Sequence, residues 1–252
     1  MREGARVGVV IPAAGTGTRM GSGGPKQFLE LDGRPIVAWT IGHFQRSAEV
    51  DSIVVVAGDA QIDAMRQIIS DFHFSKVRAV VAGGARRQDS VWNGLRSLGD
   101  RGEDIGNRGA DVGFHGTDLV LVHDAVRPFI DRKIIQDLLS ALSHAEAALV
   151  AIPAKDTIKL AGLDGFVLAT PPREEVWIAQ TPQACRYADL CAAFELAAND
   201  GFSATDEAGL LERLGKRVAI VRGSYDNIKI TTPEDLELAK LISRRRQAQA
   251  DH

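Results

Sequence analysis

The chain has 252 residues, of which 45% are hydrophobic, so it is long enough to build a substantial core. Its formal net charge of −3 gives no bulk attraction to nucleic acid or to a membrane surface, and we expect neither as a partner. The apolar run near the N-terminus is too short for a signal peptide and no run reaches transmembrane length, so we expect a cytoplasmic protein.

Short runs rich in valine and isoleucine alternate along the chain with stretches whose apolar residues recur at helical spacing. The predicted strands are residues 7–11, 53–57, 77–81, 119–123, 148–152 and 217–221. The predicted helices are residues 35–45, 60–72, 88–98 and 131–142. This alternation is typical of a Rossmann-like α/β fold, a mostly parallel sheet with helices on both faces. Since there is no internal repeat and no clear linker, residues 1–252 are predicted to form a single domain.

Two segments interrupt the alternation. Residues 99–117 contain six glycines and little apolar periodicity, which predicts a flexible surface insertion. Residues 153–180 contain two short strand-like pieces around a Gly-Leu-Asp-Gly turn, which predicts a β-arm projecting from the main sheet. Such an arm is too thin to be stable alone, so we expect it to pack on a second copy of the chain in a homodimer. The last residues, from 244 onward, are predicted to be a frayed tail.

The loop after the first predicted strand, residues 11–31, reads IPAAGTGTRMGSGGPKQFLEL and carries two cations, Arg19 and Lys26. The dinucleotide fingerprint G-x-G-x-x-G fails here because Met20 stands at the third glycine. The Walker A pattern fails because a proline precedes Lys26 and a glutamine follows it. An open loop with backbone N–H groups and two cations facing a common space suits a triphosphate. The alternative is an ordinary strand-to-helix turn with exposed charges.

Polar clusters also follow four later predicted strands. They are GGARRQDS at residues 83–90, HDAVRPF at 123–129, AKDTIK at 154–159 and GSYDNIKITTPEDL at 223–236. In an open parallel sheet, ligands bind beyond the carboxyl ends of the strands. The clusters are therefore expected to place several phosphate-directed cations along one edge of the sheet.

Seven sequence motifs, which occur once each, are spread in order over nearly the whole chain. They leave out residues 99–117 and the last few residues. They are PAAGTGTRMGSGGPKQFLELDGRPIVAWTI, GGARRQDSVWNGL, VLVHDAVRPF, DTIK, QTPQ, TDEAGLLE and DNIKITTPEDLELA. Together they resemble the 2-C-methyl-D-erythritol 4-phosphate cytidylyltransferase family of the nucleotidyltransferase superfamily. The resemblance implies a nucleotidyltransferase-type fold. It also implies an enzyme of non-mevalonate isoprenoid precursor synthesis that condenses CTP with a methylerythritol phosphate, giving a CDP-alcohol and pyrophosphate.

The same resemblance implies roles for the residues at matching positions. Arg19 and Lys26 match the catalytic pair that stabilises the transition state at the α-phosphate. The implied nucleotide-binding residues are Ala13, Ala14, Gly15, Gly84, Arg87, Ser90, Asp124 and Ala125. The implied substrate-positioning residues are Arg127, Thr157, Arg173 and Lys229. Because two of these lie in the arm, the resemblance implies active sites shared between the chains of a homodimer.

A divalent cation, Mg²⁺, is expected to neutralise the triphosphate and help pyrophosphate leave, and Asp124 is the candidate that reaches it, directly or through water. No general base stands out. His123 is predicted to be packed or hydrogen-bonded, and Asp206 and Glu207 fit a helix start after Thr205. The expected nucleophile is a phosphate monoester with a second pKa of about 6, so it is largely dianionic at neutral pH without a base.

Two other functions stay open. A ribitol 5-phosphate cytidylyltransferase would share the nucleotide half of the site, and a catalytically silent nucleotide-sensing module could use the same fold. Single residues also have simpler interpretations. Asp124 could be an acid at a helix N-terminus, Thr157 part of the arm's polar face, and Lys229 an edge-strand lysine that prevents aggregation. At Ala85 and Arg86 the sequence departs from many relatives, which have an acid near this turn.

Overall fold

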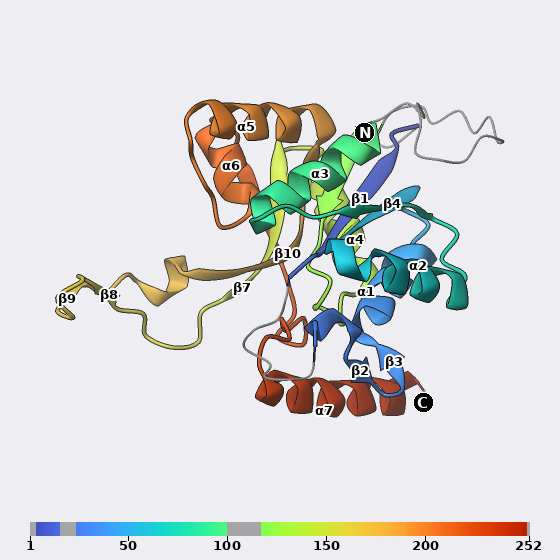
Figure 1. Ribbon diagram of the computed structural model, residues 1–252. Coiled ribbons are helices and arrows are strands. Elements are labelled where there is room, and N and C mark those ends of the chain that lie inside the picture. Colours follow the sequence, from blue (N-terminus) through green and yellow to red (C-terminus); the bar gives the residue numbers. More distant parts are fainter. Residues whose placement is uncertain (1–3, 16–23, 100–116, 251–252) are drawn as a thin grey trace.

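A seven-stranded sheet forms the centre of the computed structural model, which describes residues 4–15, 24–99 and 117–250 (Figure 1). Its strands are β1 (Val7–Ala13), β4 (Ser52–Ala57), β5 (Val77–Ala82), β6 (Leu119–Val122), β7 (Ala147–Pro153), β10 (Trp177–Arg186) and β11 (Val218–Arg222). The strand order is β11-β7-β10-β6-β1-β4-β5. β10 runs antiparallel to β6 and β7, and the other neighbours pair in parallel. The predicted mostly parallel sheet is confirmed.

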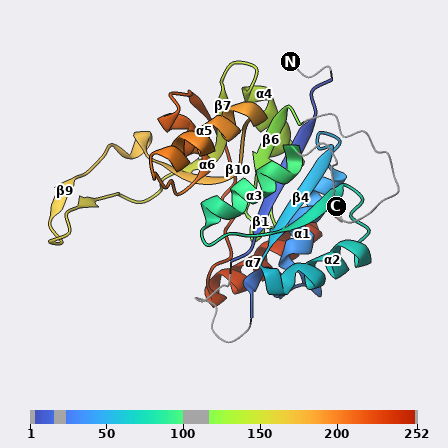
Figure 2. The same ribbon diagram turned by 45° about the horizontal axis from the view of Figure 1, so that its top comes forward.

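Helices cover both faces of this sheet, as the sequence predicts (Figures 1 and 2). They are α1 (Ile36–Arg46), α2 (Ile62–Asp71), α3 (Arg87–Gly99), α4 (Arg132–Ala141), α5 (Tyr187–Asn199), α6 (Glu207–Arg213) and α7 (Pro233–Ala250). One apolar cluster joins the sheet to α1, α2 and α4, and a second joins its other face to α3, α5 and α6. Along β1, Val9 and Ile11 enter the first cluster and Val10 enters the second, as the two-residue period of a strand requires.

The helix α3 packs unusually close to the sheet. A Cβ atom on Gly94 would lie 2.5 Å from Val10 Cγ1 and 2.8 Å from Val56 Cγ2, so only glycine fits at this point of the helix. The close packing fixes the first turn of α3, which begins at Arg87, relative to the end of β1. The polar residues at the start of α3 are thereby set beside the loop that follows β1.

A small layer at one end of the molecule combines the short strands β2 (Glu30–Leu31) and β3 (Arg34–Pro35) with α7 (Figure 1). Leu31, Ile36, Ile230 and Ile242 are among the buried side chains that join these elements. The frayed tail expected from residue 244 is wrong: α7 continues to Ala250, and Arg246, whose Nη1 lies 3.0 Å from Asp131 Oδ1, ties this part of the helix to the start of α4.

The C-terminal half differs from the sequence predictions in further elements. β10 and α5 are absent from the predictions, and residues 177–180, expected in the arm, belong to β10. Between β7 and β10 the chain leaves the sheet and carries β8 (Leu160–Ala161), β9 (Val167–Ala169) and a 3-10 turn, η4 (Arg173–Glu175). Figures 1 and 2 both show this segment extending away from the sheet and its helices. Most of the predicted insertion at residues 99–117 lies outside the described residues. No helix in the described part of the chain is long and apolar enough to cross a membrane.

Candidate active site

The loops that follow β1, β5 and β6, together with the segment after β11, enclose a cleft of about 470 Å³. β1, β4, β5 and β6 are parallel, so their carboxyl ends lie at one edge of the sheet, where the polar clusters were expected to meet. The cleft is lined by Pro12, Ala13, Ala14, Gly15, Lys26, Gln27, Gly84, Ala85, Arg86, Arg87, Ser90, Asp124, Ala125, Val126 and Lys229. Most of the site residues predicted from the sequence are in this set.

The remaining predicted residues have other positions. Arg19 lies outside the described residues. Arg127 does not line the cleft but lies behind Asp124, with 11% of its side chain exposed and Nη1 donating to Asn227 O at 2.7 Å. Thr157 and Arg173 are exposed on the arm and are absent from the cleft of their own chain.

One wall of the cleft is backbone held by short polar contacts. Gln27, which is buried in the 3-10 turn η2 (Lys26–Phe28), donates from Nε2 to Ala13 O at 2.6 Å. Opposite, a Cβ atom on Gly83 would lie 2.4 Å from Ala14 Cβ, so glycine lets the two loops approach. Ser90 Oγ accepts from Gly84 N at 3.0 Å and fixes the turn. The two loops touch at this point, and Ala13, Ala14 and Gly84 line the part of the cleft beside it, which forms a slot. The contribution of Gln27 was not predicted from the sequence.

The other wall carries a cluster of charges around Asp124, whose side chain is 8% exposed. Asp124 Oδ1 lies 3.3 Å from Arg87 Nε, and Oδ2 lies 3.0 Å from Lys229 Nζ and 3.4 Å from Arg127 Nε. Burial alone would raise the pKa of Asp124, but Arg87, Lys229 and Arg127 together hold it well below its usual range. Asp124 is therefore a permanent anion that holds three cations from three parts of the chain.

Glu207 is a site residue that the sequence analysis interpreted only as part of a helix start. Asp206 is the cap of α6, since its Oδ1 accepts from Gly209 N at 3.0 Å. Glu207 turns inward instead and pairs with Arg87, with Oε1 2.7 Å from Nη1. Burial raises the pKa of Glu207 against the opposing effect of Arg87. The sequence did contain a signal for the inward orientation of Glu207. The short apolar run Ala208–Leu211 follows it and turns this face of the helix toward the core.

The positions of Asp124 and Lys229 exclude the simpler interpretation of each residue. Asp124 is followed by turns and not by a helix, so it is not an acid at a helix N-terminus. Lys229 lies in an irregular segment after β11 and is not an edge-strand lysine. The packed role of His123 is confirmed: it is fully buried, and Nδ1 and Nε2 lie 3.0 Å from Thr181 Oγ1 and Arg127 O. Burial lowers the pKa of His123 to about 4.

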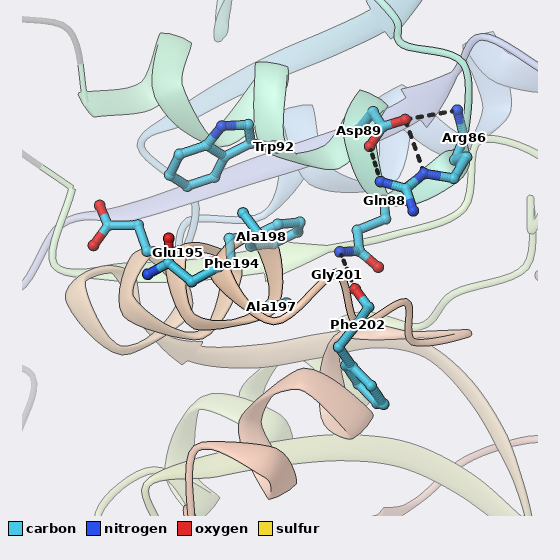
Figure 3. Close-up of a pocket in the computed structure, with 11 residues that line it drawn as sticks. Arg86, Gln88, Asp89, Trp92, Phe194, Glu195, Ala197, Ala198, Gly201 and Phe202 are labelled. Carbon is cyan, nitrogen blue, oxygen red and sulfur yellow. Dashed lines mark hydrogen bonds and ion pairs between the residues drawn. The ribbon is translucent and has the colours of Figure 1, made fainter.

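A second hollow, of about 580 Å³, lies between α3 and α5 (Figure 3). Trp92 and Phe194 stack in it with ring centroids 5.3 Å apart, and the Arg86–Asp89 ion pair stands at its rim. Arg86 lines both this hollow and the cleft. The hollow lacks the gathered cations of the cleft, so the cleft is the better site for a phosphorylated ligand.

The fold and the cleft define an α/β protein of the class that binds phosphorylated ligands: phosphate-directed cations gather beyond the carboxyl ends of a mostly parallel sheet. Sequence comparison gives the family within this class. The sequence profile of the 2-C-methyl-D-erythritol 4-phosphate cytidylyltransferase family matches residues 7–245, and the chain belongs to this family.

Individual relatives agree with this membership. The chain is 48% identical over 236 residues to a protein of this name from Geotalea uraniireducens, which covers 93% of the chain and 95% of the relative. It is 43% identical over 234 residues to one from Halalkalibacterium halodurans, covering 93% and 95%. The structure of a 4-diphosphocytidyl-2C-methyl-D-erythritol synthase from Anaerococcus prevotii superposes with a TM-score of 0.80 at 30% identity, covering 96% of this chain and all of that one.

Proposed function

We propose that the protein transfers the cytidylyl group of CTP to 2-C-methyl-D-erythritol 4-phosphate, giving a CDP-alcohol and pyrophosphate, in non-mevalonate isoprenoid precursor synthesis. The observation that carries the proposal is the single cleft in which Lys26, Asp124 and Lys229 meet from distant parts of the chain. Family membership supports the same activity.

In this reaction an oxygen of the methylerythritol phosphate attacks the α-phosphorus of CTP. The new P–O bond forms while the bond to the oxygen bridging the β-phosphate breaks, and that electron pair leaves with pyrophosphate. The attacking phosphate, with a second pKa of about 6, is already largely deprotonated at neutral pH. The site therefore has to align the reactants and screen charge, which agrees with a cleft rich in cations and with a buried His123 that is engaged in packing.

Lys26 and Arg19 act on the α-phosphate in this proposal. Charge gathers on the equatorial oxygens of the phosphorus under attack, and fixed cations lower the barrier where they fit the transition state better than the substrate. Lys26 lines the same cleft as Ala13 and Ala14. Arg19 is assigned by the motif that it shares with the family.

The slot between the two backbone loops receives the cytosine ring. Ala13, Ala14 and Gly84 line the space proposed for the pyrimidine. Ser90 Oγ, which accepts from Gly84 N and donates to Arg86 O, has one lone pair left to accept a hydrogen bond there. Gly15, Arg87, Asp124 and Ala125 complete the nucleotide half. In the acceptor half of the site, Lys229 positions the methylerythritol phosphate. Arg127 supports Lys229, because both side chains contact Asp124.

Mg²⁺ fits this cleft as an ion held mainly by the phosphates of CTP, as is usual for this cation. Among the described residues no group of three or more His, Cys, Asp or Glu side chains could hold a metal alone. Asp124 is the only acidic residue among those found to line the cleft, and it would hold the ion directly or through water. When bound, Mg²⁺ neutralises charge on the triphosphate and on the leaving pyrophosphate.

A homodimer completes the site in this proposal, and the arm is its contact. Thr157 and Arg173 lie on the arm, away from the cleft of their own chain. The arm also exposes large apolar side chains, with Phe166 and Leu168 each 73% exposed. Unpartnered apolar surface of this kind favours packing on a second copy. We also propose a cytoplasmic location, because the reaction consumes CTP.

The proposal is tested by measuring pyrophosphate release from CTP and Mg²⁺ with 2-C-methyl-D-erythritol 4-phosphate, with ribitol 5-phosphate and with no acceptor. We expect release that depends on the methylerythritol phosphate, and a higher kcat/KM for CTP than for ATP or GTP. A preference for ribitol 5-phosphate would contradict the assigned acceptor, and CTP binding without any acceptor-dependent release would indicate a nucleotide sensor. Equal use of a purine triphosphate would contradict the pyrimidine slot.

A further inference from the structure

Glu207 holds the guanidinium of Arg87 at two points. Its side chain is 3% exposed, and Oε1 and Oε2 accept hydrogen bonds from Arg87 Nη1 at 2.7 Å and Nη2 at 3.2 Å. A guanidinium paired in this way is fixed in orientation as well as in charge. Arg87 lines the cleft, whereas Glu207 lies behind it, so the acid acts on the cleft through the arginine.

The pairing decides which atoms of Arg87 reach Asp124. With both Nη atoms held by Glu207, Arg87 donates to Asp124 through Nε alone, at 3.3 Å from Oδ1. The other oxygen, Oδ2, stays 3.0 Å from Lys229 Nζ. A free Arg87 would turn its planar fork onto Asp124, the favoured geometry for a carboxylate, and would compete with Lys229 for the same oxygens.

Hydrogen bonds hold both partners of this pair. On either side of Glu207, Asp206 Oδ2 accepts from Gln183 Nε2 at 2.9 Å and Ala208 N donates to Gln183 Oε1 at 2.8 Å, which ties α6 to β10. Beside Arg87, Gln88 Oε1 accepts from Ala204 N at 3.1 Å, and Gln88 Nε2 donates to Phe202 O (Figure 3). The start of α3 and the start of α6 are therefore fixed to one another.

The ion-pair network around Arg87 joins three cations to two carboxylates. Arg87, Arg127 and Lys229 face two carboxylates, Asp124 and Glu207. Asp124 is shared by all three cations, while Glu207 binds only the arginine. Of the three cations, Arg87 and Lys229 line the cleft, where they suit a phosphorylated ligand.

We propose that Glu207 is a positioning residue for nucleotide binding: it holds Arg87 so that the guanidinium faces CTP and leaves Lys229 on Asp124. The inference rests on the proposed function, because it takes CTP as the ligand. It adds to that function a residue behind the cleft on which the affinity for the nucleotide depends.

The test is the affinity for CTP in the presence of Mg²⁺, measured by titration calorimetry, for Glu207→Gln. Glutamine offers one acceptor and one donor, so an N–H group faces an N–H group of Arg87 and the two-point pairing is lost. We expect the affinity to fall about tenfold, within the range of coupling between residues of one charge network, with KM for CTP rising by a similar factor and kcat changing by less than about threefold. Glu207→Asp, which keeps the charge, should recover part of the loss.

A double-mutant cycle separates this role from a structural one. In an Arg87→Met background, adding Glu207→Gln should change the affinity by less than about twofold, since the acid has no arginine left to position. An equal loss in both backgrounds would overturn the proposal, as would unchanged affinity in folded Glu207→Gln. The matched control is Glu212→Gln on the exposed side of α6, which should bind CTP normally.

Folding and function remain distinguishable in these experiments. If Glu207→Gln fails to fold, Glu207→Asp takes its place, because the shorter side chain keeps the charge but cannot reach both Nη atoms in the same way; full wild-type CTP affinity in that variant would contradict the proposal. The binding measurement needs no acceptor. Wild-type protein that binds CTP but releases no pyrophosphate would contradict the proposed reaction and leave the role of Glu207 measurable.

Discussion

Lys26 is the described residue through which the chemistry of the cleft can be tested most simply. In Lys26→Ala we expect kcat to fall by about 10²-fold or more, because a preorganised charge at the developing oxyanion is lost, while CTP binding weakens much less. Steady-state kinetics with both substrates measure this. Lys133→Ala, which removes a lysine exposed on α4, is the control and should behave as wild type. Near-normal turnover of Lys26→Ala would exclude the catalytic role.

At the scale of residues, the sequence predicted the parts of the site that lie in continuous motifs. The polar clusters after β1, before α3 and at Asp124 were noticed because each follows an apolar strand, and the roles of their residues were assigned by the resemblance to the family. Glu207 was not identified because its partner, Arg87, is 120 residues away and a helix-start acid has the same local pattern. Gln27 was missed for a similar reason, since its acceptor is the backbone of Ala13, which carries no sequence signal.

At the scale of elements, the close packing of α3 on β1 makes Gly94 a test of how the helix holds the cleft. Gly94→Ala puts a methyl group 2.5 Å from Val10 Cγ1, so α3 must move outward. We expect a loss of roughly 1–3 kcal/mol in the free energy of unfolding, the usual cost of overpacking, although alanine is the better helix former. Urea unfolding measures the loss. Arg96→Ala, on the exposed side of the same helix, should cost little. An equally small change at Gly94 would contradict the tight packing.

His43, which lies on α1, is expected to make the free energy of unfolding depend on pH. His43 Nε2 lies 2.9 Å from Pro128 O, so the helix holds the loop that carries Asp124. Burial, aided by Arg46, lowers the pKa of His43 to about 4. The unfolded chain therefore binds more protons than the folded protein between about pH 6.5 and pH 4, and stability falls as the pH drops through this window.

Urea unfolding at pH 7 and pH 5 measures this effect. We expect the wild type to lose roughly 1–2 kcal/mol more than His43→Asn over this interval, because the variant has no imidazole to protonate. His144→Asn removes an exposed histidine and should keep the wild-type pH dependence. Equal pH dependence in wild type and His43→Asn would show that the imidazole does not stay neutral in the fold.

The strands could be predicted from the sequence where they consist of a nearly unbroken run of apolar residues. Runs of valine and isoleucine marked six of the seven strands of the sheet to within two residues at each end. β10 was missed because polar residues, Gln180 to Gln183, interrupt it where its register with β7 shifts. α7 is absent from the predictions. Its second half is polar, and ion pairs with distant residues, Arg245 with Asp226 and Arg246 with Asp131, hold it to the rest of the fold.

At the scale of the whole molecule, the proposed homodimer predicts recovery of activity between two inactive variants. Lys26→Ala damages the cleft and Thr157→Ala damages the arm. In a mixed dimer one site contains both substitutions and the other contains neither. Random exchange makes about half of the dimers mixed, so about a quarter of all sites should be wild type. Activity after mixing measures this. If nothing returns although ultracentrifugation shows dimers that exchange subunits, the arm does not serve the partner's site, and a monomer at assay concentration would contradict the dimer itself.

The location of the nucleotide is the point on which the account as a whole depends, and a crystal structure with CTP and Mg²⁺ determines it directly. We predict the cytosine ring beside Ala13, Ala14 and Gly84, with the triphosphate beside Lys26 in the cleft. CTP bound in the hollow between α3 and α5, or in the cleft with its triphosphate directed away from Lys26, would contradict the assignment of the active site.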